Sequence, residues 1–195
     1  EVIMHVAIAS SLTIILLTSL SSIRSHLNIG NVEKTVIKKW YKGILIGSLI
    51  GSFFASKING EILVIIFISL ACIISINMFF QNKIRILREE VPNSSFINLI
   101  ISGSIGFLSS IMGIGGGSFS VPTLIIFSKK MHKAVGTSSV IGFFIALPSS
   151  ISYIFLGLSV ENLPPYSIGY VNILIVSLVA STSIFTANIG ARLTS

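Results

Sequence analysis

The sequence predicts an all-α, polytopic transmembrane protein, and three observations support that prediction. First, only 10% of the 195 residues are charged and 52% are hydrophobic, whereas soluble domains carry about 25% charged residues. Second, the apolar residues form runs long enough to cross a bilayer, and most basic residues lie between these runs. Third, one uncharged run, 96–127, is interrupted by glycines near its centre.

Six apolar runs define the predicted spans in chain order. They cover residues 2–23, 43–58, 61–80, 96–127, 134–158 and 168–189. The first basic connection, 24–42, has a predicted turn at Gly30 and carries Trp40 and Tyr41 where an aromatic belt at the membrane interface would lie. The other basic connections are 83–88 and 129–133.

Small residues recur at every fourth position of the second run. They are Gly43, Gly47, Gly51 and Ala55. Residues four apart lie on one face of a helix, and small side chains let membrane helices approach closely. We therefore predict that this face packs against another helix, and that the third run, 61–80, which is the least polar, faces lipid over much of its surface.

The run 96–127 is too long and too interrupted for one straight membrane helix. It would measure about 48 Å at ~1.5 Å per residue, against a hydrocarbon core of ~30 Å. Gly113 to Gly117 and then Pro122 are predicted to break it, as a re-entrant loop or as two half-helices. A break places helix N-terminal N–H groups and the positive dipole end at mid-membrane, which suits an anion. Close packing by small residues explains the glycines equally well.

The chain also repeats itself. Residues 4–11 align with 131–138 at an offset of 127, which also pairs Gly30 with Gly157, and a further shift of eight pairs 55–58 with 190–193. We predict one transmembrane domain, 1–195, made of two repeats at about 1–90 and 96–195. The first repeat's broken element would precede Glu1 and a span would follow Arg192, so the sequence is expected to lack both ends.

Basic residues predict how the repeats are oriented. If the broken element returns to the side from which it entered, twelve of the thirteen Lys and Arg residues lie on one side. The positive-inside rule favours this arrangement, which inverts one repeat relative to the other. We therefore expect a multi-pass protein of the cell (inner) membrane with 24–42, 83–88 and 129–133 in the cytoplasm.

Several blocks of residues resemble one known family. Gly106-Phe107-Leu108, 113–117 with Pro122, and 134–138 are similar to the signature of the sulfite exporter TauE/SafE family, and 169–172 and 187–193 resemble its second-half pattern, with Asn188 where proline is expected. The resemblance implies an inner-membrane transporter with two homologous halves. Its expected substrates are small anions such as sulfite, sulfonates or related organosulfur compounds.

Carrying a small oxyanion requires hydrogen-bond donors without a fixed charge that would trap the ion. No Lys or Arg is predicted deep in a span. The candidate substrate-binding residues are Gly113, Gly115, Gly116, Gly117, Ser118 and Pro122 of the broken element, Thr137 and Ser138 of the second repeat, and Ser10 and Ser11 of the first. Each hydroxyl could instead bond back to its own helix.

Two histidines occupy equivalent positions at the start of the repeat helices. His5 and His132 are candidates for proton coupling or gating, because histidine titrates near neutral pH. The alternative is an interfacial residue that caps a helix.

Other chemistry finds little support in the sequence. The histidines lack metal-ligand spacing, no lysine follows the glycines as in a phosphate-binding loop, and no βαβ pattern surrounds them. We expect no metal, no cofactor and no enzyme activity. The net charge of +7 is assigned to topology and to contact with anionic lipid, not to nucleic acid. The expected partners are a small anionic substrate and the lipid bilayer, and the alternatives are a non-transporting accessory or structural subunit and a transporter of an unrelated small solute.

Overall fold

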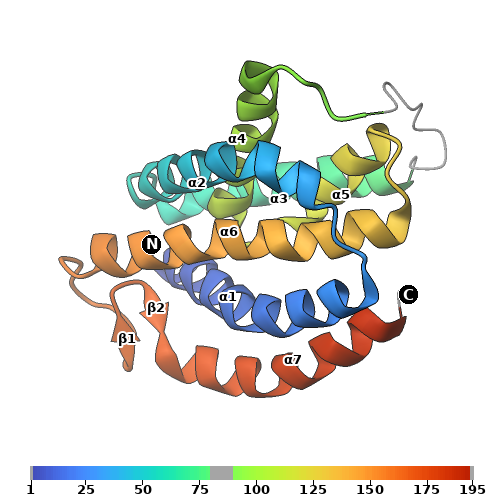
Figure 1. The fold of residues 1–195 in the computed structure, drawn as a ribbon. Helices are drawn as coiled ribbons and strands as arrows, with labels where there is room; N and C mark the ends of the chain where they lie inside the picture. The colour runs from blue at the N-terminus through green and yellow to red at the C-terminus, as the bar shows by residue number, and fades with distance from the viewer. Residues whose placement is uncertain (1, 80–89, 194–195) are drawn as a thin grey trace.

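The computed structural model describes residues 2–79 and 90–193, and helices dominate it (Figure 1). The elements are α1 (Ile3–Ile29), α2 (Lys34–Ser56), α3 (Gly60–Phe79), α4 (Ser95–Met112), α5 (Gly117–Ile126), α6 (Met131–Gly157), β1 (Ser167–Ile168), β2 (Val171–Asn172) and α7 (Ile173–Leu193). Within the described residues, α1, α4 and α6 are long and apolar enough to cross a membrane. The all-α, polytopic prediction is confirmed, with one short antiparallel hairpin before α7.

The first basic connection is mostly helical, which corrects the prediction of a loop over 24–42. α1 continues to Ile29, Gly30 ends it with a left-handed φ of 78°, and α2 begins at Lys34. Lysine and arginine are good helix formers, so they extend both helices past the apolar core instead of ending them. The turn predicted at Gly30 is confirmed, and 83–88 lies outside the described residues.

The small-residue face of α2 packs against α4, as predicted. A Cβ atom on Gly47 would overlap the carbonyl oxygen of Gly103, and one on Gly51 would lie 2.5 Å from the carbonyl oxygen of Phe107. Trp40 lies on the same side and is fully buried, so its assignment to an aromatic belt is wrong. Its indole Nε1 donates to Asn98 Oδ1 of α4 at 3.0 Å. Trp40 lies six residues inside α2, on the face that contacts α4.

The predicted break at the glycines is confirmed, whereas the break at Pro122 is not. α4 ends at Gly113 with a φ of 68°, Gly115 has a φ of 77°, and α5 starts at Gly117. Both angles lie in the left-handed region that glycine adopts without strain. Pro122 lies inside α5, where it removes only the hydrogen bond to the carbonyl of Ser118, and the helix continues to Ile126.

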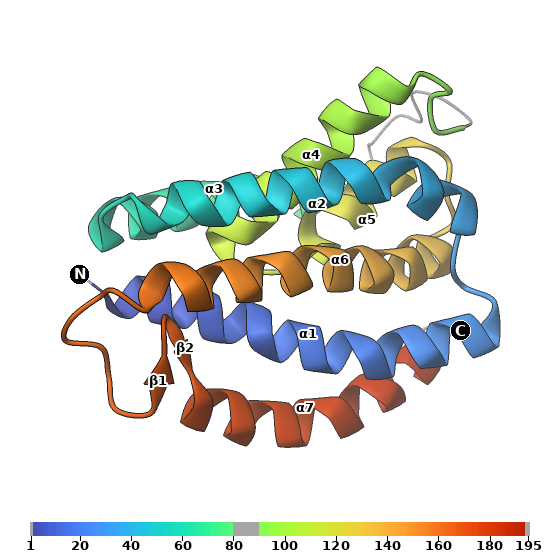
Figure 2. The ribbon, with the colours of Figure 1, turned by 60° about the vertical axis from the view of Figure 1, so that its left-hand side comes forward.

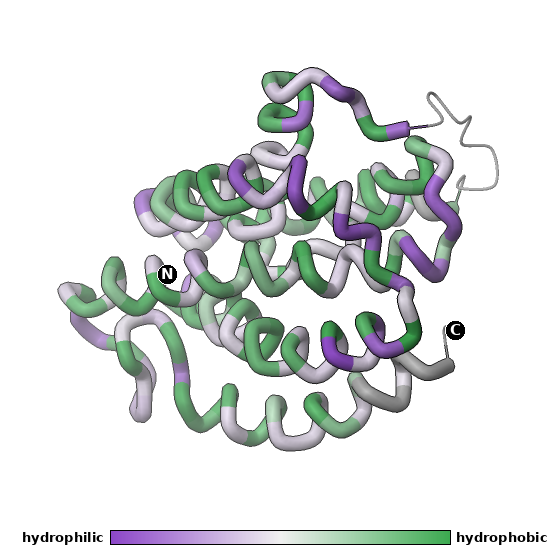
Figure 3. The backbone as a smooth tube through the Cα atoms, in the orientation of Figure 1, coloured by the Kyte–Doolittle hydropathy of each residue, from purple (hydrophilic) through white to green (hydrophobic). Residues whose placement is uncertain are grey.

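The broken element returns to the end of the bundle from which it started. Lys133 at the start of α6 forms an ion pair with Glu33 before α2, with Nζ and Oε1 2.8 Å apart. Lys39 of α2 contacts Val91, just before α4. Both ends of the element therefore meet the α1–α2 turn, which we call the basic end. Hydrophilic segments gather there in Figure 3, and Figure 2 shows the same arrangement from another side.

The two halves pack in a crossed and reciprocal way. α1 and α6 each have 27 residues and run antiparallel (Figures 1 and 2). α2 packs on α6, and α7 packs on α1. The backbone N–H of Glu33 donates to Thr137 Oγ1 at 2.9 Å, and that of Asn172 donates to Ser10 Oγ at 3.0 Å. The two acceptors, Ser10 and Thr137, are 127 residues apart and so match under the offset, and each donor directly precedes its helix, α2 or α7. The repeat boundaries stay a prediction.

Candidate functional site

A pocket of about 280 Å³ lies beside the break between α4 and α5. Its walls come from α1, the break, α6 and the end of α7. The lining residues are Ile15, Thr18, Ser19, Ser22, Ile114, Gly115, Gly116, Gly117, Ser138, Ser139, Gly142 and Ala187. None of them is charged. At ~30 Å³ per water, the volume would hold roughly nine waters, or a small anion with part of its hydration shell.

Gly116 of the break and Gly142 of α6 have no side chains, so the break lies directly on α6. A Cβ atom on Gly116 would lie 2.8 Å from Ile141 Cγ2 and 3.0 Å from the backbone nitrogen of Gly142. Gly117 differs, because a Cβ there would meet only Ser138 Oγ, at 4.0 Å. Gly116 is therefore a packing position, and Gly117 faces free space beside Ser138.

The N-terminus of α5 reaches this pocket at Gly117 and carries backbone donors that the helix does not use. Its first hydrogen bonds run from the backbone and the hydroxyl of Ser120 to the carbonyl of Gly116. The N–H groups of Gly117, Ser118 and Phe119 precede this bond and have no partner within the helix. Gly116, the N-cap, carries no side chain to cover them. They form the positive end of the helix dipole, equivalent to about half an elementary charge.

The pocket hydroxyls mostly bond back to their own helices. Ser138 donates to the Val135 carbonyl at 2.7 Å, and Ser139 donates to the Gly136 carbonyl at 2.8 Å. On α1, Thr18 and Ser19 do the same toward the preceding turn. These hydroxyl protons are occupied, so the backbone N–H groups of α5 are the better donors to an anion.

The structure brings together only part of the predicted site. Gly115, Gly116, Gly117 and Ser138 line the pocket, whereas Gly113, Ser118, Pro122, Thr137, Ser10 and Ser11 are not among its lining residues. Ser11 instead donates to the Gly113 carbonyl at 2.7 Å, which holds the end of α4 against α1. Ser10 and Thr137 accept the two reciprocal bonds from the opposite half.

Sequence reasoning missed the α1 wall of the pocket. Ser22 lies four residues after Thr18 and three after Ser19, which places the three on one side of α1. That spacing of polar residues in an apolar run was the available signal. Gly142 was missed because an isolated glycine in a long helix gives no pattern of its own.

The histidines lie away from the pocket. His5 is buried near the end of α2, with Nε2 3.2 Å from the carbonyl oxygen of Ala55 and 3.0 Å from that of Ile58. Its ring stacks on Tyr170 at a centroid distance of 5.1 Å, and Tyr170 contacts Tyr153 edge-on. Hydrogen bonding to two carbonyls requires a proton on Nε2, and it caps the C-terminus of α2. His132 is half-buried at the start of α6.

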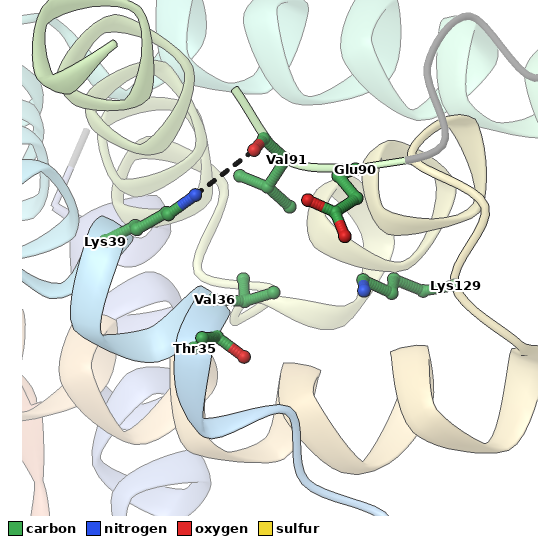
Figure 4. Close-up of a pocket in the computed structure, with 6 residues that line it drawn as sticks. All are labelled: Thr35, Val36, Lys39, Glu90, Val91 and Lys129. Atoms are coloured by element: carbon green, nitrogen blue, oxygen red, sulfur yellow. Dashed lines mark hydrogen bonds between the residues drawn. The ribbon is translucent and has the colours of Figure 1, made fainter. Parts of the chain in front are cut away.

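A smaller cavity of about 100 Å³ lies at the basic end (Figure 4). Thr35, Val36, Lys39, Glu90, Val91 and Lys129 line it. Lys39 Nζ donates to the carbonyls of Val91 and Pro92 and to Asn93 Oδ1. These bonds use all three ammonium protons, so Lys39 fastens the segment before α4 to α2. Within the described residues, no group of three His, Cys, Asp or Glu residues could hold a metal ion.

A polytopic helical bundle whose glycine-broken helix opens on an uncharged pocket is the architecture of a membrane transporter. The sequence profile of the sulfite exporter TauE/SafE family matches residues 2–195, so this chain belongs to that family. The predicted resemblance is confirmed. Membership makes the protein an integral membrane transporter with a small-molecule substrate.

Relatives from distant organisms carry the same description. The chain is 29% identical over 197 residues to a probable membrane transporter protein of Haemophilus influenzae, covering 100% of this chain and 73% of that protein. It is 28% identical to one of Methanocaldococcus jannaschii, covering 96% and 69%. It is 27% identical to the probable membrane transporter protein YunE of Bacillus subtilis, covering 78% and 63%. No solved structure matches the chain.

Proposed function

We propose that this chain forms part of a secondary transporter for a small oxyanion of the sulfite or sulfonate class. The observation that carries the proposal is the N-terminus of α5, whose first residue, Gly117, lines the 280 Å³ pocket and whose first-turn N–H groups have no partner within the helix. Anions are stabilised at such helix ends by the N–H groups and the dipole together. The family description, sulfite exporter, supports the same substrate class.

The uncharged lining favours transport over tight binding. A fixed lysine in a site of low dielectric constant would attract an anion strongly and slow its release. Backbone N–H groups offer hydrogen bonds with only about half a unit charge behind them. The substrate can then enter from water, exchange part of its hydration shell for these donors and leave again.

We further propose that the protein lies in the inner membrane and that its basic end faces the cytoplasm. The distribution of lysine and arginine supports this orientation. The pocket is lined by Ser22 of α1 and Ser138 of α6, which lie in the halves of these helices nearer the basic end. In this orientation the pocket would exchange substrate with the cytoplasm.

His5 fits a gating role better than proton coupling. With Tyr170 and Tyr153 it forms a buried aromatic cluster at the end of the bundle opposite the basic end. The cluster joins α1, α6 and the hairpin, so separating the repeats there would require it to open. Under the offset of 127, His132 is the equivalent of His5 and lies at the basic end. We propose that it closes the basic end when the transporter is open at the other end.

Uptake into vesicles tests the proposal. The complete gene product is reconstituted and offered labelled sulfite, sulfate, thiosulfate and a small sulfonate, with and without a pH gradient. We expect saturable uptake of one or more of these anions, reduced at least tenfold in Gly117→Val, which places two methyl groups beside Ser138. Gly103→Ala, a substitution on the α4 face away from the pocket, is the matched control and should leave uptake unchanged.

Two results would contradict the proposal. Folded, correctly inserted protein that moves none of these anions would leave an accessory subunit or another solute as the function. Full uptake by Gly117→Val would place the substrate elsewhere. Thermal melting of each variant in detergent separates both results from simple unfolding.

A further inference from the structure

One face of α7 is bare along its length. It carries Leu178, Thr182, Thr186 and Gly190, which are spaced four residues apart and are all exposed. A Cβ atom on Gly190 would meet nothing within 4 Å. The opposite face, with Val176 and Ala180, is buried, on the side where α7 packs on α1. We call the four exposed positions the α7 stripe.

The equivalent positions on α2 are covered. The alignment of 55–58 with 190–193 sets an offset of 135, which pairs the α7 stripe with Gly43, Gly47, Gly51 and Ala55. All four are buried. The first three lie against the backbone of α4 between Leu99 and Phe107. The equivalent helix face is therefore buried against α4 in α2 and exposed in α7.

The remaining neighbours of α2 and α7 correspond. α2 packs on α6 as α7 packs on α1. The residue directly before each of these helices donates its backbone N–H to an equivalent hydroxyl, Glu33 to Thr137 and Asn172 to Ser10. Among the described residues, the neighbour that α2 has and α7 lacks is a counterpart of α4.

The composition of the α7 stripe favours protein over lipid as its cover. The hydroxyls of Ser181, Thr182 and Thr186 donate to carbonyls of their own helix, so a helix can cover them without leaving donors unpaired. Small and hydroxyl residues are enriched where membrane helices meet. The exposed surface of α3 is different, since it presents Ile65, Ile68, Ile73 and Ile76.

We propose that the α7 stripe is the docking surface for a second glycine-broken helix pair of the α4–α5 kind, supplied by the same polypeptide outside residues 1–195. α4 and α5 together occupy residues 95–126. The Haemophilus influenzae relative has about a quarter of its length outside its match to this chain, which is room for such a pair.

The repeat also predicts which residues the break in this second pair would contact. Gly116 lies against Ile141 and Gly142, and subtracting 127 gives Ile14 and Ile15. Ile15 and Gly142 are already neighbours, because a Cβ on Gly142 would lie 4.0 Å from Ile15 Cγ2. The second break would therefore lie against α1 at Ile14 and Ile15, as the first lies against α6 at Ile141 and Gly142. Both breaks would meet where α1 contacts α6, beside the 280 Å³ pocket.

Site-directed spin labelling of the complete gene product tests the proposal. Leu178, Thr182 and Thr186 are replaced by Cys one at a time in a Cys72→Ser background, and Ile68→Cys on α3 is the control. We expect labels on the α7 stripe to be immobile and at least fivefold less accessible to oxygen than the control label. Oxygen accessibility equal to the control would overturn the proposal, because lipid would then cover the stripe.

A photocrosslinker at position 178 identifies the cover. We expect crosslinks, mapped by mass spectrometry, to a segment of the same polypeptide outside residues 1–195. Crosslinks between two copies of the protein would overturn the proposal in favour of a dimer interface. The crosslinking arm uses one exposed position, so it remains informative even where a spin-labelled variant fails to fold.

Discussion

Gly117 is the residue on which the functional account depends most directly. A glycine at the first position of a helix usually needs no special explanation, but a Cβ atom here would lie 4.0 Å from Ser138 Oγ, in the pocket that Gly117 and Ser138 both line. Gly116, its neighbour, is excluded as a test position because its substitution would disturb the contact with Ile141. The two glycines are indistinguishable in the sequence and differ only in what lies around them.

The buried pair Trp40 and Asn98 is predicted to stabilise the α2–α4 contact. Asn98 Oδ1 accepts from the indole, and its amide donates to the carbonyls of Pro92 and Ser94 at 2.6 and 2.9 Å. Asn98→Leu leaves a buried indole N–H unpaired, which costs about 1–3 kcal/mol. Thermal melting in detergent should show a lowered transition, with exposed Ser104→Ala unchanged. An equal transition for Asn98→Leu would mean that water replaces the lost acceptor.

The ion pair between Glu33 and Lys133 predicts a pH dependence. The hydrogen bond from Lys133, with the charges of Lys133 and Lys129, holds the pKa of Glu33 below its ordinary value of 4.5, against the opposing effect of burial. A lowered pKa contributes stability that is complete above the ordinary value and is lost as the pH falls through the folded value. Both side chains are partly exposed, so the contribution is about 0–1 kcal/mol.

Glu33→Gln should therefore melt slightly below the unsubstituted protein at pH 7, and this difference should shrink as the pH is lowered through and below 4.5. Lys133→Gln should show the same loss, and the double variant should lose no more than either single one. A difference between Glu33→Gln and the unsubstituted protein that is constant across this range would show that the ion pair contributes nothing.

At the level of elements, the contact between α2 and α4 predicts that two similar glycine substitutions change stability differently. Gly47→Ala places a methyl group onto the Gly103 carbonyl and should destabilise the protein by about 1–3 kcal/mol. Gly103→Ala meets only the Gly43 carbonyl oxygen, at 3.7 Å, and should be neutral or stabilising by up to about 1 kcal/mol. Melting temperatures measured side by side decide this. Equal losses would contradict the close approach of the helices.

The sequence predicted elements well where a local pattern determines them. Small residues at every fourth position identified the packing face of α2, and consecutive glycines identified the break. Trp40 and Pro122 were misjudged because a residue type alone does not say which face it occupies or whether a helix continues past it. Trp40 is buried against α4 because it shares a face of α2 with Gly43 and Gly47, and α5 accommodates Pro122 at the loss of one hydrogen bond.

The candidate site was less predictable because it depends on contacts between distant segments. The offset of 127 pairs Ser10 with Thr137, but the partners of both are backbone N–H groups of turns in the opposite half. Those partners appear only when α1 and α6 lie side by side. The α1 wall of the pocket was missed for the same reason.

For the whole molecule, the return of the broken element to the basic end predicts a specific sidedness. Lys34 and Lys130 lie at this end and are exposed, and Lys57 lies at the far end of α2. Each is replaced by Cys in a Cys72→Ser background and labelled with a membrane-impermeant maleimide in intact cells and inverted vesicles. We expect positions 34 and 130 to label only in inverted vesicles and position 57 only in intact cells. Labelling of 34 and 130 from opposite sides would mean that the element crosses the membrane once.

The most direct test of the whole account is substrate protection of a cysteine in the pocket. Ser138→Cys in the complete, Cys72→Ser gene product places a thiol beside Gly117, where it can react with a small methanethiosulfonate reagent. The account predicts that the transported oxyanion slows this reaction several-fold at saturating concentration, while chloride at equal ionic strength does not. An unchanged rate in the presence of an anion that the same protein transports would contradict binding at the α5 N-terminus.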